Sequence, residues 1–464
     1  MQWAVLARCT VRFIQALETK GGRHISDQEK PLIAAPPVGD STKRWPRRVI
    51  GLASNVPLFG MGTPLGMIPI TVLALMQTNL PRGRLLRFCL LTAVAGFVAL
   101  GASAVWQDVR IPIVSMQHFL VFAVAVIGLS GIVRTSDEAV HLLAWLSLGT
   151  VAYYVIIGSA RTAEGIEALW KFGIAFPVTA LTLYLLVRRN VPGYVVTFAL
   201  VGFGIYGMYL NSRAYALICF AVALFDFLRR SRKGLTRLRL WLGITGLLAL
   251  GTVTPQLMLS GVFGEEVRLK TLSQTTGDGF ALLDGRTEPP LAIAAIMEKP
   301  FAGWGNEQAI TWHVIYSGVR LAEYMGMYNP DDYLRYWVRP GGRISIHSIF
   351  FESWIQGGII AALFPIALLV TLVVGFVRMR GKYSIVVTLV CAQASWDLIF
   401  SPWVANKSIY LAVLVLAVTL PLSREQLDEM EMTSAHRSAR LSLLSQPPGL
   451  RSGAYGKVQD GPNT

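Results

Sequence analysis

The architecture of this chain is clearest at one boundary in the sequence, Gly341-Gly-Arg-Ile-Ser-Ile-His347-Ser-Ile-Phe-Phe-Glu352. Before it lies a polar segment of roughly residues 260 to 346, and after it the chain becomes apolar again. Between about residue 49 and about residue 421, apolar runs of about 17 to 25 residues recur, and a run of that length crosses a hydrocarbon core of roughly 30 Å. The pattern predicts an all-α, polytopic membrane protein with one large polar loop.

Composition agrees with this prediction. The chain is 53% hydrophobic and 15% charged, which is too apolar for a soluble domain. Its net charge of +15 does not indicate a nucleic-acid partner, because the basic residues cluster between apolar runs, where membrane proteins place them. The cysteines, Cys9, Cys89, Cys219 and Cys391, do not form the pattern of a disulfide framework.

We predict about twelve membrane-spanning helices from the length and spacing of the apolar runs. The residues between Pro57 and Gly66 are rich in proline and glycine, so they predict a break between the first two spans rather than one long helix. The predicted spans are 49–60, 62–79, 86–106, 111–133, 138–158, 167–187, 191–210, 213–228, 237–258, 347–377, 383–400 and 405–421.

The basic clusters predict the sides of the membrane. With an even number of spans, every connection rich in Arg or Lys falls on the cytoplasmic side, whereas an odd number would contradict this distribution. The polar loop then faces away from the cytoplasm. The predicted organisation is a basic cytoplasmic tail, nine spans, the loop, three spans and a disordered cytoplasmic tail, with boundaries at 1–48, 49–258, 259–346, 347–421 and 422–464.

Three side chains at this outer face are candidates for chemistry: Arg213, Arg286 and His347. A guanidinium group stays charged and binds phosphate through two hydrogen bonds, and a histidine can take a proton from a hydroxyl. A helix start adds backbone N–H groups that favour an anion. Each residue also has a structural interpretation, as an interface arginine, an ion pair of Arg286 with Asp284 or Glu288, or a capping histidine.

Two acidic residues could support these three. Glu352 follows His347 by about one helical turn and could orient its imidazole, or could pair with Arg343. Asp397 could pair with an arginine of the site, and a structural pairing is the simpler interpretation. The outer-face pair Asp331-Asp332 lacks the spacing of a metal site, so neither a metal nor a cofactor is predicted.

Short motifs follow one another in a recognisable order. Ser212-Arg213-Ala214 begins a span, Gly285-Arg286 precedes an apolar helix that runs into Glu298-Lys-Pro-Phe-Ala-Gly-Trp-Gly305, and His347-Ser348 precedes Gln356-Gly357-Gly358. This order, over roughly residues 195 to 421, resembles the superfamily of O-antigen ligases and O-antigen polymerases. The resemblance implies a GT-C-like glycosyltransferase in the bacterial inner membrane with its active site on the periplasmic side.

In that superfamily, the two arginines are thought to hold the diphosphate of an undecaprenyl-linked glycan, which implies this role for Arg213 and Arg286. The histidine, here His347, is thought to activate the acceptor hydroxyl, and Ser348 stands where the family often has Asn. The reaction would be inverting and independent of metal, with lipid A core (ligase) or another lipid-linked glycan (polymerase) as acceptor and membrane lipids around it. We favour a ligase.

Two other functions remain open at this level. A polysaccharide transporter or flippase is favoured by the number of spans alone, but charged residues near the predicted bilayer centre are sparse. A structural membrane subunit would leave Arg213, Arg286 and His347 scattered.

Overall fold

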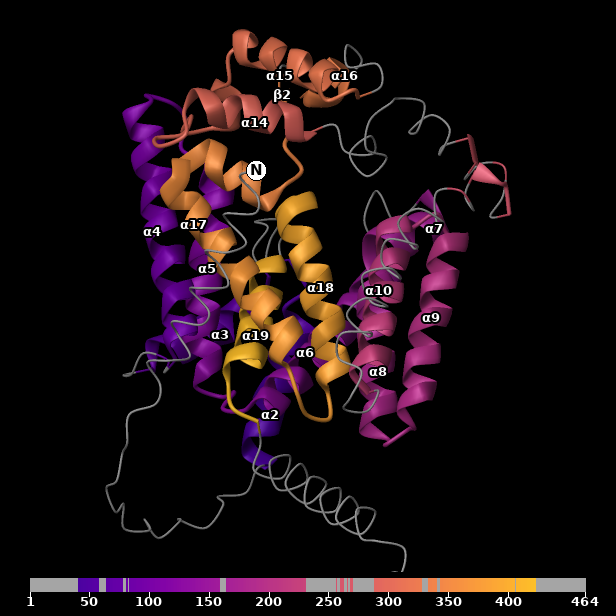
Figure 1. Ribbon diagram of the computed structural model, residues 1–464. Helices are drawn as coiled ribbons and strands as arrows, with labels where there is room; N and C mark the ends of the chain where they lie inside the picture. The colour runs from indigo at the N-terminus through magenta and orange to yellow at the C-terminus, as the bar shows by residue number, and fades with distance from the viewer. Residues whose placement is uncertain are drawn as a thin grey trace, which may run out of the picture. The chain divides into compact units, whose positions relative to one another are not determined.

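The computed structural model describes residues 41–57, 64–77, 81, 83–158, 164–230, 256, 259–262, 265, 268–269, 288–327, 333–339, 343–404 and 406–422. All described side chains belong to one compact unit, Trp45–Thr464. The described structure is almost entirely helical (Figure 1). Its apolar segments form α2 (Ser41–Ala53), α3 (Met67–Leu75), α4 (Arg84–Trp106), α5 (Ile113–Ser130), α6 (Ser136–Ile156), α7 (Ile166–Leu169), α8 (Ala175–Arg188), α9 (Gly193–Tyr209), α10 (Arg213–Arg230), α17 (Ile349–Arg378), α18 (Ser384–Phe400) and α19 (Lys407–Thr419).

The helices follow the predicted spans closely. Every predicted span contains a described helix except 237–258, which lies outside the described residues apart from Gln256. Among the described helices, five are long and apolar enough to cross a membrane: α4, α5, α6, the continuous helix from α7 to α8, and α17. Helices α9, α18 and α19 are apolar but shorter. The chain therefore has the helices of a membrane-embedded protein.

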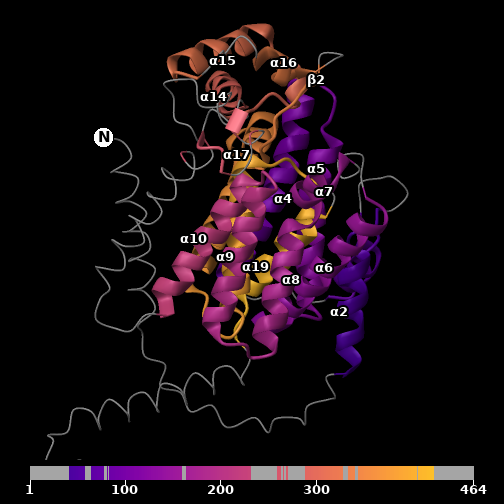
Figure 2. The same ribbon diagram turned by 90° about the vertical axis from the view of Figure 1, so that its right-hand side faces the viewer.

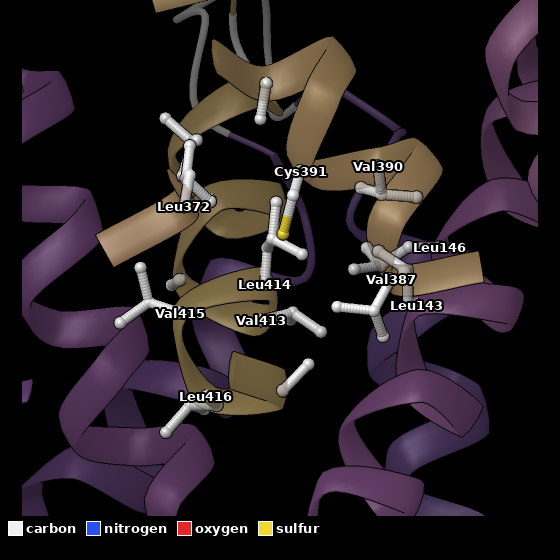
Figure 3. Close-up of a cluster of buried hydrophobic side chains, with 14 of the residues drawn as sticks. Leu143, Leu146, Leu372, Val387, Val390, Cys391, Val413, Leu414, Val415 and Leu416 are labelled. Atoms are coloured by element: carbon white, nitrogen blue, oxygen red, sulfur yellow. The ribbon is translucent and has the colours of Figure 1, made fainter. Parts of the chain in front are cut away.

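A tightly packed apolar core joins the carboxyl-terminal helices to α6. Figure 3 shows that side chains of α18 and α19 interdigitate with those of α6 and α17. Burial of this kind holds helices together in lipid through close van der Waals packing rather than through a hydrophobic driving force. The labelled members are Leu143, Leu146, Leu372, Val387, Val390, Cys391, Val413, Leu414, Val415 and Leu416.

The first two helices differ from the predicted spans 49–60 and 62–79, because α2 begins eight residues before its span and α3 is shorter than its span. The break between them is confirmed, and an isolated bridge pairs Pro57 with Pro64 there. However, α3 has only nine residues, or about 14 Å of helix, which is less than half of a hydrocarbon core.

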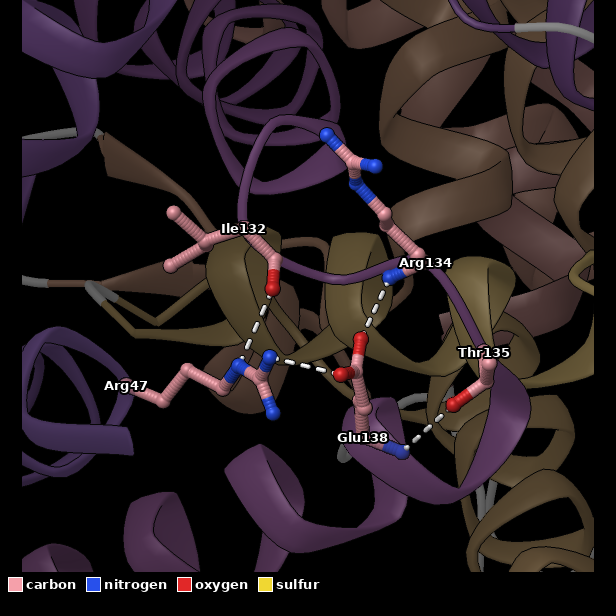
Figure 4. Close-up of polar contacts among 5 residues, drawn as sticks. All are labelled: Arg47, Ile132, Arg134, Thr135 and Glu138. Atoms are coloured by element: carbon pink, nitrogen blue, oxygen red, sulfur yellow. Dashed lines mark hydrogen bonds and ion pairs between the residues drawn. The ribbon is translucent and has the colours of Figure 1, made fainter. Parts of the chain in front are cut away.

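Both open ends of the α2–α3 pair lie beside the connection between α5 and α6. In the middle of α2, the Arg47 guanidinium donates to Ile132 O at 2.9 Å and pairs with Glu138 at 2.6 Å (Figure 4). After α3, the Gln77 amide lies against Gly131. At the turn, Asn55 donates to Leu146 O, ten residues or about 15 Å along α6. The pair therefore enters and leaves at one end of the bundle.

At the other end of the bundle lies a small domain, which we call the cap domain (residues 288–346). It consists of α14 (Glu288–Glu298), a 3-10 turn (Glu307–Ala309), α15 (Trp312–Tyr324), α16 (Tyr333–Trp337), and strands β1 (Val338–Arg339) and β2 (Arg343–Ile344), which pair antiparallel. Figures 1 and 2 show α14 between α15 and the end of α17. The cap domain has its own apolar core around the fully buried Trp337.

The cap domain is anchored in an interruption of α17. The sequence predicted one span over 347–377, but Gly358 has φ +66° and breaks the helix. The segment 300–305 occupies the break: Trp304 N donates to Ile355 O at 2.6 Å, Gly305 N to Gln356 O at 2.9 Å, and Ile359 N to Pro300 O at 3.1 Å. These bonds satisfy two carbonyl groups and one N–H group that a broken helix would leave unpaired in an apolar setting.

Candidate functional site

His347 lies in the short extended segment between β2 and α17, at the boundary of the cap domain and the membrane helices. Its side chain is 26% exposed, so it is accessible to a substrate. The next residue, Ser348, is the N-cap of α17: its Oγ accepts a hydrogen bond from Phe351 N at 3.2 Å. Ser348 therefore fixes where the helix begins, and its hydrogen bond goes to the backbone rather than to the imidazole.

Two charged residues of the cap domain contact opposite nitrogens of the His347 ring. Glu288 Oε1 lies 3.3 Å from Nδ1, and Arg339 Nη2 lies 3.2 Å from Nε2. Ser345 Oγ is 3.4 Å from Nδ1. A guanidinium group has only donors, so Nε2 must be the acceptor in its contact with Arg339. The ring proton is then on Nδ1, which faces the Glu288 carboxylate and Ser345 Oγ.

The fold of the cap domain positions both charged partners. Glu288 is the first residue of α14, where the positive end of the helix dipole favours a carboxylate. Arg339 ends β1 and pairs in register with Arg343 of β2. The Gln308 amide holds β2 from the other side, because it donates to Ile344 O at 3.2 Å and accepts from Ile344 N at 3.0 Å.

Glu352 occupies a different cluster from the predicted one. Its carboxylate accepts from Ser115 Oγ at 2.7 Å and from Gln356 Nε2 at 3.4 Å, and the same amide nitrogen also donates to Glu307. His347 precedes the helix, so the helical spacing that would bring it to Glu352 does not apply. Glu288 holds the position beside the imidazole that the sequence suggested for Glu352.

Asp397 is paired with lysine rather than with an arginine. Its carboxylate forms an ion pair with Lys407 and accepts from Gln393 Nε2 at 2.8 Å and from Ser401 Oγ at 2.9 Å. Its side chain is 11% exposed. These contacts join the end of α18 to the start of α19, and so the structural interpretation of Asp397 holds while the predicted arginine partner was wrong.

The two predicted arginines have different outcomes. Arg213 is half-buried at the start of α10, which packs against α9 and α18, and it is not among the residues that contact His347. Arg286 lies outside the described residues, as does the pair Asp331-Asp332. The structure therefore joins His347 with Glu288 and Arg339, two residues to which the sequence gave no role in catalysis.

No family model, curated protein or solved structure matches this chain.

The contacts of His347 combine three chemical properties. The carboxylate beside Nδ1 orients the imidazole so that Nε2 is the nitrogen left to accept a proton. A guanidinium group at Nε2 can instead bind an anion that arrives next to the base. The position of the group between an accessible cap domain and apolar helices suits a substrate that is part lipid and part polar.

Proposed function

We propose that this chain is a membrane glycosyltransferase of the O-antigen ligase type, which transfers a glycan from undecaprenyl diphosphate to a hydroxyl acceptor. The observation that supports it best is the contact of His347 with Glu288 on one side and Arg339 on the other. A base flanked by an anion-binding group matches a reaction in which a hydroxyl loses its proton while a diphosphate departs.

In the proposed reaction, Arg339 leaves Nε2 of His347 and binds a diphosphate oxygen of the donor. The freed Nε2 accepts the proton of the acceptor hydroxyl as that oxygen bonds to the anomeric carbon. The bond between this carbon and the diphosphate oxygen breaks, and its electron pair leaves with the diphosphate. Attack from the face opposite the leaving group inverts the anomeric centre, and Glu288 stabilises the imidazolium formed.

Arginine can supply the charge stabilisation that this reaction needs. One guanidinium at about 4 Å from a phosphate oxygen contributes on the order of 4 kcal/mol at an effective dielectric constant near 20, before desolvation. Arg339 is in place beside the base. Arg286 precedes Glu288 by two residues in the sequence, and Arg213 begins a helix that packs on α18, so we assign them the remaining contacts with the diphosphate.

The proposal includes a topology of the bacterial inner membrane with the cap domain on the periplasmic side. We keep the even number of about twelve membrane segments. We count α2 and α3 as two of these segments, although neither crosses the membrane. The pair enters and leaves on the same side, because both of its ends lie beside the connection between α5 and α6. The basic connections then remain in the cytoplasm.

The acceptor distinguishes two versions of this function. In a ligase it is lipid A core, and in a polymerase it is a second lipid-linked glycan. A strain that lacks the gene would be complemented with His347→Ala, and its surface polysaccharide and lipid-linked intermediates analysed. A ligase defect leaves free lipid-linked polymer, and a polymerase defect leaves single repeat units.

The matched control is His313→Ala, which changes an exposed histidine of the cap domain that makes no contact with His347. Normal polysaccharide is expected from this control. Normal polysaccharide from His347→Ala as well would overturn the proposal and favour a transporter or a structural subunit.

A further inference from the structure

Four residues of α15, spaced by four positions, form one exposed row, which we call the aromatic row: Trp312, Tyr316, Arg320 and Tyr324. Side chains at this spacing lie on the same face of a helix. Trp312 and Tyr316 are each 55% exposed and Tyr324 is 88% exposed, and the first two rings have centroids 6.1 Å apart. Large aromatic surfaces kept in water indicate a binding face.

The aromatic row points away from the rest of the cap domain. The opposite face of α15 is buried, and Gly318 on that face brings its backbone close to Leu291 of α14. Figures 1 and 2 both place α15 on the side of α14 that is remote from the membrane helices. The row therefore lies on the part of the cap domain that is remote from the membrane helices.

The composition of this face favours a carbohydrate. Its exposed residues are aromatic or polar, and the described residues of α15 include no exposed aliphatic side chain. A sugar ring has an apolar face of C–H groups that stacks on an aromatic ring, and hydroxyls that bond to groups such as Arg320 and Glu323.

The aromatic row and His347 are held by the same short segment. Gln308 bonds to both backbone groups of Ile344, which lies three residues before His347. Trp312 follows Gln308 by four residues. The start of the row is thus tied to the segment that carries the base.

We propose that the aromatic row binds the glycan chain of the lipid-linked donor beyond its reacting sugar. This inference rests on the proposed function and specifies its substrate: a chain of several sugars rather than a single unit. A long donor gains stacking contacts that a donor with one repeat unit cannot reach, so the row raises affinity for long donors.

The test uses the full-length protein in detergent with the double variant Trp312→Ala, Tyr316→Ala. The probes are the polysaccharide that mild acid releases from the lipid carrier and the single repeat unit. We expect the Kd for the polysaccharide to rise about tenfold and binding of the single unit to stay unchanged. Transfer from long donors should show the rise in KM, with kcat unaltered.

The matched control is Tyr194→Ala, Phe198→Ala, which removes two exposed aromatic rings at the same spacing from α9. It should leave both probes unaffected. An unchanged Kd in the cap-domain variant would overturn the inference, and so would a photo-crosslinker at position 316 that captures a protein while glycan binding is normal.

His347→Ala separates this test from that of the proposed function. If the histidine variant loses transfer at every chain length while the double variant behaves as the wild type, only the aromatic row is refuted. If the histidine variant transfers normally, the proposed function fails.

Discussion

Substitution Gly358→Ala tests the anchor of the cap domain. Gly358 has φ +66° and ψ −165°, a backbone region that is almost restricted to glycine. A Cβ at this position would lie 1.8 Å from Phe301 O and 2.5 Å from Phe301 C. Both atoms are backbone, so the segment 300–305 must move out of the break in α17.

The expected loss of stability follows from these contacts. The backbone conformation alone costs an alanine about 1–3 kcal/mol. Displacing the segment also breaks the three backbone hydrogen bonds at Pro300, Trp304 and Gly305, each with a net contribution of about 1 kcal/mol. The free energy of unfolding should fall by at least about 3 kcal/mol, and the cap domain should detach first.

Thermal unfolding of the purified protein and limited proteolysis of the cap domain would measure both effects. We expect a Tm lower by at least about 4 °C and faster cleavage within residues 288–346. Gly202→Ala is the control, because a Cβ there meets no atom within 4 Å. An unchanged Tm and cleavage rate in Gly358→Ala would show that the anchor does not hold the cap domain in place.

Three further predictions concern the site and the helices. Glu288→Gln removes the charge beside His347 and should slow transfer about 100-fold, whereas Glu352→Gln should have little effect. Equal transfer rates of these two variants in an assay with lipid-linked donor would exclude the proposed role of Glu288. Asp397→Ala leaves the ammonium group of its partly buried partner Lys407 unpaired and should destabilise the protein by about 3 kcal/mol. Adding Lys407→Met should restore part of the lost Tm, and absence of any rescue would argue against their coupling. A cysteine at position 65, in the turn between α2 and α3, should not react with an impermeant maleimide added outside intact spheroplasts. A cysteine at an exposed position of α15 should react. Labelling of position 65 from outside would mean that the turn reaches the outer side of the membrane.

Much of the membrane scaffold could be predicted from sequence, because its two signals are local. The length of an apolar run indicates the length of a helix, and proline and glycine indicate where it is interrupted. The prediction placed α4, α5 and α6 within a few residues of their observed ends. The same rules overestimated α3, because hydropathy does not distinguish apolar residues in a helix from those in the turn that precedes it. The pair Gly357-Gly358 indicates a possible break in α17. What occupies the break could not be predicted, because it is a segment about 55 positions earlier in the sequence.

The partners of His347 show the limit of sequence reasoning. Sequence proximity favoured Glu352, yet the residue that faces the imidazole is Glu288, which reaches it through the packing of α14 on α17. The sequence marks Glu288 as the acidic first residue of a short helix with Pro289-Pro290. No sequence pattern indicates Arg339, because the pairing of β1 with β2 is what brings it to the imidazole ring.

The break in α17 also imposes an order of assembly. The receptor for the segment 300–305 is the backbone of Ile355 and Gln356, which the ribosome makes about fifty residues after that segment. The nascent cap domain can form its internal contacts early. The carbonyl groups that bind the segment 300–305 are in place only after α17 has been synthesised and has adopted its break at Gly358. Truncation of the chain before Ile355 would therefore leave the cap domain without its seat in α17, and only its contacts with α4, such as the hydrogen bond from Ser103 Oγ to Ala302 O, could hold it.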